Sequence, residues 1–328
     1  MAATVGIVSI GEMGYGIARL LVAHNFKILT NVQGRSANTE SRARDAQLTL
    51  VPTDRDLVTR SDYILSIVPP RDAEATARRM AAEVAAARQT ATHPLYYLDL
   101  NAISPASVRA IGALFASSET SVRFVDGGII GGPPQPGAAA TSSSSSAAAA
   151  AAAGGSSTWT RPSVPLSGPF PLAEAPVAGA RLADALNTRH LGPGVGTASG
   201  LKACFAALSK GLTGLAIQSF STAEQLGVRG ELQEHLRMHS PRTAEMVERG
   251  LVGMVPKAYR WVAEMERIGE TFEEDGGWGE KARVFEGIAE VYRMVAEESE
   301  VGKERRKGAE LGNVVGSVVK GLRKEKEE

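Results

Sequence analysis

The sequence is poor in several features that mark large classes of protein. It has one cysteine, Cys204, so no disulfide can form within the chain and a reducing compartment, the cytoplasm, is expected. Its 36 basic side chains balance 36 acidic ones, which gives no reason to expect a nucleic acid or a charged membrane as partner. No apolar run approaches the roughly 18 residues of a membrane span, and no charged segment precedes a signal-like run. These absences predict a soluble protein without a membrane partner.

Histidine is also scarce. None of the five histidines has a neighbour at a spacing typical of a zinc or catalytic site; they are His24, His93, His190, His235 and His239. His235 and His239 are four residues apart and could share a helix face, but no carboxylate is placed to complete a metal site. We therefore expect no metal.

The chain length of 328 residues suggests two domains of about 150 residues each. Short apolar runs alternate with helical patterns over residues 1–135, which is typical of a doubly wound, mostly parallel sheet covered by helices. The strands are expected at 5–10, 27–32, 62–68, 95–100 and 122–126, and the helices at 14–25, 71–88 and 104–115. A serine cap followed by proline, Ser104-Pro105, marks the start of the last of these helices.

Residues 137–158 are almost entirely Ala, Ser, Gly and Thr. Such a segment has too little apolar area to compensate for the entropy of ordering, so we expect a disordered insertion. A strand ending at Gly168 and a helix over 172–186 follow. From residue 199 the apolar spacing predicts helices at 199–226, 231–250, 256–272 and 281–298. The expected organisation is an α/β Rossmann domain over 1–195, an all-helical domain over 196–320 and a charged, frayed tail over 321–328.

The segment from Val5 to Gly16 resembles a dinucleotide-binding turn in which serine replaces the first glycine. The turn spans Ser9, Gly11, Glu12, Met13 and Gly14, and it would present the start of a helix to a diphosphate. Gly11 allows a close approach of the backbone to the diphosphate, and Gly14 allows the helix to pack on the strand. Serine can replace the first glycine if its φ remains negative. The alternative is an ordinary strand-to-helix turn that binds no nucleotide.

The end of the second strand bears on the choice of nucleotide. NAD-selective sites carry an acidic residue there, which binds the ribose 2′-hydroxyl. This chain has no carboxylate between Thr30 and Ser36, whereas Arg35 and Ser36 could bind a 2′-phosphate. The sequence therefore favours NADP(H), with an ordinary solvent-exposed arginine as the alternative.

Taken together, these motifs resemble the β-hydroxyacid dehydrogenase superfamily, which includes 3-hydroxyisobutyrate and 6-phosphogluconate dehydrogenases. The resemblance covers the opening turn with its Met13-Gly14 pair, and four further segments in family order: SIVPP at 66–70, LDLNAISP at 98–105, FVDGGIIGGPP at 124–134 and GPGVGTASGLKACFAALSKGL at 192–212. The helical remainder resembles the C-terminal domain of a phosphogluconate-dehydrogenase-like subgroup. The resemblance implies a Rossmann domain followed by a helical domain that forms dimers.

The resemblance also assigns residues to roles. Lys202 takes the place of the family's general acid/base, Val68 and Pro69 that of the loop under the nicotinamide, and Gly131 and Gly132 that of the substrate loop. A lysine can protonate the oxygen on which hydride transfer builds negative charge, if desolvation lowers its pKa. The alternative is a lysine on the helix surface.

Two positions depart from the family pattern. Ile130 stands where the family has a serine, and Ala206 where it has an asparagine. Neither side chain can donate a hydrogen bond, so the expected pocket is less polar. Asn101 could restore a polar contact beside the nicotinamide and Lys210 one to the substrate, although either residue could instead cap a turn or face solvent.

The leading hypothesis is an NADP(H)-dependent oxidoreductase that acts on a small hydroxyacid or carbonyl compound, with Lys202 as general acid/base and a homodimer as the assembly. Decarboxylation, as in the phosphogluconate branch, has less support because the polar partners of the lysine are missing. One alternative is an imine reductase, favoured by the less polar pocket. Another is a catalytically silent NADP-binding protein, which Ile130 and Ala206 favour and Lys202 argues against.

Overall fold

The computed structural model describes residues 3–87, 93–116, 122–137 and 159–324. The chain divides into two compact units, Met1–Lys202 and Ala203–Glu328. The boundary therefore falls within the long helix, and Lys202 is the last residue of the first unit rather than a member of the helical one. The low-complexity segment lies outside the described residues apart from Gly137, so the expected disorder stays a prediction.

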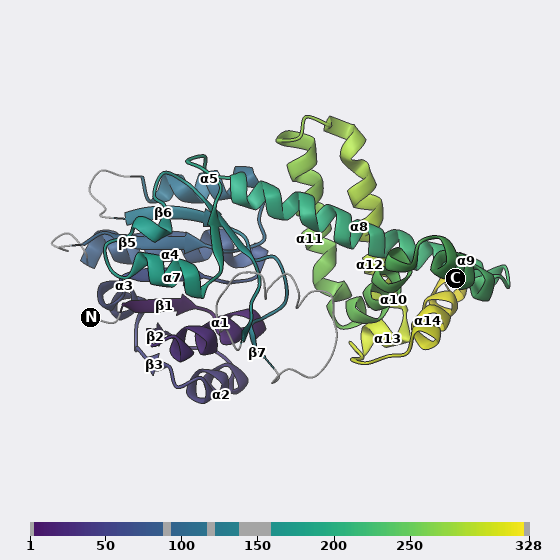
Figure 1. The fold of residues 1–328 in the computed structure, drawn as a ribbon, viewed down its shortest axis with the longest axis horizontal. Coiled ribbons are helices and arrows are strands. Elements are labelled where there is room, and N and C mark those ends of the chain that lie inside the picture. The colour runs from purple at the N-terminus through teal and green to yellow at the C-terminus, as the bar shows by residue number, and fades with distance from the viewer. Residues whose placement is uncertain (1–2, 88–92, 117–121, 138–158, 325–328) are drawn as a thin grey trace. The chain divides into compact units, whose positions relative to one another are not determined.

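The first unit is built on an eight-stranded sheet in the order β10-β9-β6-β5-β4-β1-β2-β3 (Figure 1). The strands are β1 (Thr4–Val8), β2 (Lys27–Thr30), β3 (Thr49–Leu50), β4 (Tyr63–Ser66), β5 (Leu95–Asp99), β6 (Val122–Gly127), β9 (Val164–Ser167) and β10 (Thr188–His190). The six strands from β6 to β3 are parallel, and β9 joins β6 in the antiparallel direction. The α/β fold with a Rossmann strand order is confirmed, with an antiparallel connection at one side.

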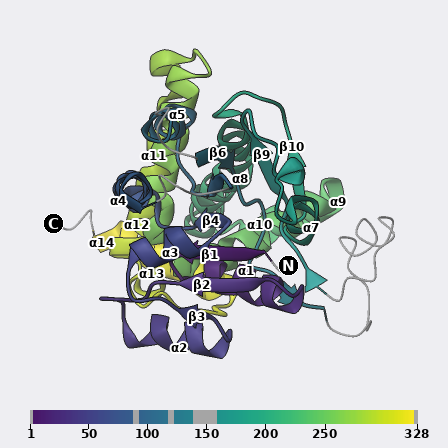
Figure 2. The same cartoon turned by 90° about the vertical axis from the view of Figure 1, so that its left-hand side faces the viewer.

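Helices cover both faces of this sheet. They are α1 (Glu12–Ala23), α2 (Ala37–Asp45), α3 (Asp54–Arg60), α4 (Ala73–Ala87), α5 (Pro105–Leu114) and α7 (Gly179–Ala185). Figure 2 shows α3, α4 and α5 on one face and α1 and α7 on the other. Each face has its own core because side chains alternate along a strand. Val5 and Ile7 of β1 join the core under α1, whereas Val8 joins the core under α3, α4 and α5.

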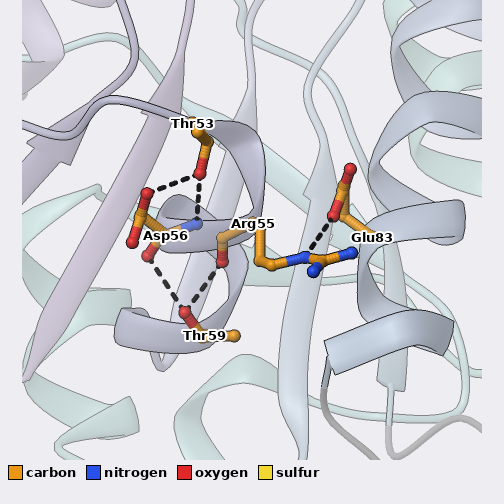
Figure 3. Close-up of polar contacts among 5 residues, drawn as sticks. All are labelled: Thr53, Arg55, Asp56, Thr59 and Glu83. Atoms are coloured by element: carbon orange, nitrogen blue, oxygen red, sulfur yellow. Dashed lines mark hydrogen bonds and ion pairs between the residues drawn. The ribbon is translucent and has the colours of Figure 1, made fainter.

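The helix α3 shows how local sequence sets an element boundary (Figure 3). Thr53 precedes the helix in an extended conformation, and its hydroxyl accepts a hydrogen bond of 3.0 Å from the Asp56 amide. The Thr53 hydroxyl also donates to the Asp56 carboxylate, so the two residues resemble a capping box. Arg55 then reaches Glu83 on α4 at 3.1 Å. This surface ion pair links neighbouring helices at a modest gain.

The second unit is helical. Its helices are the rest of α8 (Thr197–Gln225), then α9 (Arg229–His239), α10 (Pro241–Met254), α11 (Ala258–Glu274), α12 (Val284–Glu298), α13 (Glu300–Lys303) and α14 (Leu311–Lys324). The single helix expected over 231–250 is two helices, since Pro241 starts a new one. The start of the expected charged tail, residues 321–324, is helical rather than frayed, and α14 was not anticipated. Trp261 packs in this unit against Tyr292, with ring centroids 5.2 Å apart.

Several elements of the first unit also differ from expectation. The helix expected over 172–186 is a short 3-10 turn, Leu172–Glu174, followed by α7, because Pro176 cannot continue the first turn. The elements α2, α3, β3 and β10 were not anticipated. Ser104 does cap α5 as expected, with its hydroxyl 3.2 Å from the Ser107 amide and Pro105 in the first position.

Candidate active site

The predicted nucleotide turn connects β1 to α1 at the carboxyl edge of the sheet. Gly11 occupies the N-cap of α1 and no side chain caps the helix, so the first backbone N–H groups have no partner from within the helix. A Cβ at Gly11 would meet no atom closer than Ser9 Oγ at 4.0 Å. The open space above Gly11 and the uncapped helix start fit a dinucleotide diphosphate.

The turn corrects one expectation. Ser9 has a φ of +77°, so the serine adopts the left-handed conformation and not the negative φ expected for it. The reason is the close approach at Gly14, where a Cβ would lie 2.3 Å from the Ser9 carbonyl oxygen. The helix can pack this tightly only if the chain at Ser9 turns in the conformation that glycine adopts most easily.

The residues expected at the ribose end follow β2. Arg35 is exposed, and Ser36 is the N-cap of α2, where its hydroxyl lies 3.4 Å from the Thr39 amide. Ser36 therefore has a capping role that the sequence did not reveal. Arg42 on the same helix donates to the Ile10 carbonyl at 2.8 Å, which ties α2 to the turn at Ser9–Gly11. Arg42 and the helix α2 that carries it thus lie beside the predicted nucleotide turn.

A carboxylate that contacts this strand end, that of Asp54, is already paired. Asp54 accepts a hydrogen bond of 2.8 Å from the Asn31 side chain and lies 2.5 Å from Arg79 Nε. Because Arg79 neutralises it, Asp54 is a poor substitute for the ribose-binding acid of NAD-selective sites.

Asn101 joins the strand ends expected under the nicotinamide. Its side chain accepts a hydrogen bond of 2.7 Å from the Val68 amide and donates one of 3.1 Å to the Ser66 hydroxyl. Asn101 is 2% exposed, so it holds the loop at Val68–Pro69 against β5. The structure thus brings Val68, Pro69 and Asn101 together.

A buried carboxylate that the sequence analysis missed fixes the start of α8. Asp126, at the end of β6, is fully buried. Its carboxylate accepts hydrogen bonds from the backbone N–H groups of Gly196, Ala198 and Ser199 at 2.9, 3.1 and 3.3 Å. It also accepts from the Ser167 and Ser199 hydroxyls at 2.8 and 2.6 Å. The motif FVD indicated a substrate loop, but its aspartate caps a helix 70 residues away in the sequence.

Lys202 lies one turn beyond this cap. A Cβ at Gly128 would lie 3.0 Å from both Cβ and Cδ of Lys202, so the glycine makes room for the lysine stem. Gly131, with a φ of +125°, continues the same loop, and Gly132 is exposed. The lysine and the glycine-rich loop that the sequence predicted to line a substrate site therefore lie together within the first unit.

Lys210 has a different environment. It belongs to the second unit, forms an ion pair with Glu264, and its ammonium nitrogen lies 5.4 Å from the centroid of the Trp261 ring. Its backbone carbonyl accepts a hydrogen bond of 2.6 Å from the Tyr292 hydroxyl. The predicted substrate contact of Lys210 stays a prediction, and it would compete with Glu264.

A separate pocket of about 210 Å³ lies elsewhere in the first unit, between β9, β10 and α7. It is lined by Leu166, Pro171, Leu172, Ala173, Ala183, Asp184, Asn187, Thr188 and His190. None of these residues belongs to the predicted site.

Comparison with known families supports the nucleotide turn. Residues 4–154 match the NAD-binding domain of 6-phosphogluconate dehydrogenase, and residues 223–295 match a domain of unknown function. The match assigns the first domain of the chain to the NAD-binding domains of the 6-phosphogluconate dehydrogenase type. That domain is therefore an NAD(P)-binding domain, as the opening motif and the strand order independently indicate. No curated protein matches the sequence.

Several solved structures share the fold over nearly the whole chain. A Mycobacterium tuberculosis 3-hydroxyisobutyrate dehydrogenase with L-serine is 17% identical, with a TM-score of 0.64, covering 97% of this chain and 99% of its own. A conserved protein of unknown function, described as structurally similar to 3-hydroxyacid dehydrogenases, is 21% identical with a TM-score of 0.61, covering 92% and 98%. An imine reductase from Myxococcus stipitatus with NADP⁺ is 19% identical with a TM-score of 0.51, covering 95% and 99%. At these identities the likeness establishes the fold alone.

Proposed function

We propose that this 6-phosphogluconate dehydrogenase-like protein is an NADP(H)-dependent oxidoreductase that interconverts an alcohol and a carbonyl group on a small hydroxyacid. The observation that carries the proposal is the packing of Lys202 against Gly128 at the carboxyl edge of the sheet that also carries the nucleotide turn. The bound nicotinamide would supply or accept the hydride. Lys202 would give a proton to the substrate oxygen during reduction and remove it during oxidation.

The preference for NADP(H) rests on the end of β2. Arg35 is exposed beside the capped start of α2, and the adjacent Asp54 is neutralised by Arg79. A guanidinium and a helix start both favour a phosphate, whereas a neutralised carboxylate cannot favour a ribose hydroxyl as strongly. Ser36 would contribute its hydroxyl while it caps α2.

The substrate side has few polar groups. Gly131 and Gly132 offer backbone atoms, Ile130 and Ala206 offer none from their side chains, and Lys210 is paired with Glu264. This lack of side-chain donors favours a second candidate function, the reduction of an imine. An imine substrate without a carboxylate needs fewer hydrogen-bond donors than a hydroxyacid does.

Titration with NADPH and with NADH, followed by nicotinamide fluorescence, tests the cofactor assignment on the wild type and on Arg35→Ala. We expect NADPH to bind more tightly and the variant to lose at least about tenfold in affinity for NADPH, or 1.4 kcal/mol, with little change for NADH. Equal losses for both nucleotides would refute the role of Arg35. Absence of binding for either would refute the whole proposal.

A panel of small carbonyl compounds and imines, assayed with the wild type and with Lys202→Ala, then tests the chemistry. Reduction of carbonyl compounds that the variant loses supports the leading function, and reduction of imines alone supports the second. Tight binding of NADPH without turnover on either class would leave the catalytically silent NADP-binding protein.

We also propose that two copies associate through α8. Three large apolar side chains of α8 in the second unit are strongly exposed: Phe205, Leu208 and Leu215, at 52%, 79% and 53%. Among the described residues, α8 is also the one helix long and apolar enough to cross a membrane, and core helices of ordinary domains share that property. A soluble, cytoplasmic dimer predicts that light scattering gives twice the chain mass without detergent and that Leu208→Glu gives the single mass.

A further inference from the structure

The carboxyl group of Asp99 lies buried near the proposed site and has only one of its two oxygens hydrogen-bonded to residues that the structure describes. The residue is 1% exposed. One oxygen, Oδ1, accepts a hydrogen bond of 3.0 Å from the Asn101 amide. The other, Oδ2, is buried and accepts none from the residues that the structure describes. Buried polar atoms almost always have a partner, so this oxygen calls for an explanation.

Asp99 is the last residue of β5 and lies directly beside a second buried carboxylate. In register it neighbours Ser66 on β4 and Asp126 on β6. The start of α8 and two serine hydroxyls donate five hydrogen bonds to Asp126, so both oxygens of that carboxylate have partners. Asp99 has no comparable set of donors. Burial, and after it the charge of Asp126, raise the pKa of Asp99 to about 7, although the hydrogen bond from the Asn101 amide and the charge of Lys202 act to lower it.

Lys202 lies at the same corner of the sheet. Its stem packs against Gly128, two residues beyond Asp126. At the preceding residue, Gly127, a Cβ would lie 2.5 Å from the side chain of Leu100, which follows Asp99. The ends of β5 and β6 and the stem of Lys202 are thus packed together, and the lysine is close enough for its charge to act on Asp99.

We propose that Asp99 is the positioning residue for Lys202, with Oδ2 as the counter-charge that holds the lysine in its ammonium form at the strand ends. The pair can exist as ammonium and carboxylate or as amine and carboxylic acid, with the same total number of protons. Asp99 would thereby set the protonation state in which Lys202 meets its substrate. The inference rests on the proposed function for the role that it gives Lys202. Its tests measure only the pKa values of the two residues and do not require that function.

The other ionisable groups around the pair leave this assignment intact. Asp126, on β6, is engaged by α8. Tyr97 lies on the same face of β5, and burial raises the pKa of its hydroxyl, so the hydroxyl keeps its proton. The charge of Arg79 lowers that pKa by a smaller amount. Ser66, on β4, contributes only a hydroxyl. Lys202 is therefore the cation through which Asp99 can act.

The first test measures the pKa of Lys202 in protein without nucleotide or substrate. Acetic anhydride acetylates neutral amines, so the pH dependence of Lys202 labelling, read by mass spectrometry, gives the pKa. In Asp99→Asn we expect that pKa to fall by about one unit or more, with roughly tenfold faster labelling below the pKa. Asp45→Asn, which changes an exposed carboxylate on α2, should leave it unchanged. An unchanged pKa in Asp99→Asn would overturn the proposal.

A second test does not depend on the folding of Asp99→Asn. The carboxyl ¹³C resonance of Asp99, assigned through its backbone, is titrated in the wild type and in Lys202→Met. Loss of the ammonium should raise the pKa of Asp99 by a measurable fraction of a unit or more. The same titration in both proteins would refute the pairing.

These outcomes are separate from those of the proposed function. A protein that binds no nucleotide can still show the coupled pKa values, in which case Asp99 pairs with Lys202 for another purpose. A protein that reduces carbonyl compounds can show uncoupled values, in which case Lys202 acts without Asp99.

Discussion

The Asp126 side chain caps α8, and its removal should lower the free energy of unfolding of the first unit substantially. Asp126→Ala leaves two buried N–H groups, those of Gly196 and Ser199, and two buried hydroxyls without their acceptor. The third N–H group, of Ala198, keeps the Ser167 hydroxyl as an acceptor at 3.0 Å. Each unsatisfied buried group costs about 1 kcal/mol or more, with partial relief from rearrangement. We therefore expect a loss of roughly 3–5 kcal/mol in the free energy of unfolding of this unit. Asp126→Asn, which keeps one acceptor oxygen, should lose less.

Urea unfolding followed by circular dichroism gives the size of the loss, and hydrogen exchange gives its location. The amides of Gly196, Ala198 and Ser199 should exchange faster in both variants, while amides in β1 keep their protection. Asp45→Asn serves as the control. A loss below about 1 kcal/mol for Asp126→Ala, or unchanged exchange at the start of α8, would refute the assignment of Asp126 as the cap.

Three further results are expected. Gly14→Ala places a methyl carbon 2.3 Å from the Ser9 carbonyl oxygen unless the turn shifts, so thermal scans should show a lower Tm and titrations should show weaker NADPH binding. A variant with wild-type affinity would contradict the close approach. Thr53→Ala removes the cap of α3 and should cost about 1 kcal/mol in urea unfolding, with Thr53→Ser close to wild type. Asp99 holds its proton more tightly in the folded chain, with a pKa of about 7, than in the unfolded chain. The folded state therefore binds more protons between about pH 4 and 7, and the free energy of unfolding should fall by about 1–4 kcal/mol as the pH rises through that window. Asp99→Asn should lack this fall. The same pH dependence in the variant and the wild type would count against the raised pKa of Asp99.

The sequence predicted the parts of this fold that depend on local patterns. The strand β1, its glycine turn and the Ser104-Pro105 helix start depend on short-range periodicity and capping, which are readable from neighbouring residues. Pro241 is a local signal for the boundary between α9 and α10, but the apolar spacing on either side of it suggested one helix.

What the sequence could not give depends on contacts between distant segments. Asp126 and the start of α8 are 70 residues apart, and only the folded sheet brings them together. The left-handed φ of Ser9 is dictated by the packing of Gly14. The pairing of Lys210 with Glu264, and the unsatisfied oxygen of Asp99, likewise arise from neighbours that no local pattern reveals.

The position of Lys202 as the last residue of the first unit has an evolutionary consequence. Asp126 holds the helix start that carries the lysine by hydrogen bonds, and the lysine stem packs against Gly128, so both supports belong to the first unit. A helical domain of different sequence could therefore be joined after residue 202 without moving the lysine. Selection could then exchange or remodel the helical domain while Lys202 kept its surroundings in the first unit. Chimeras joined at this point, rather than at the start of α8, would keep the lysine with the domain that holds it.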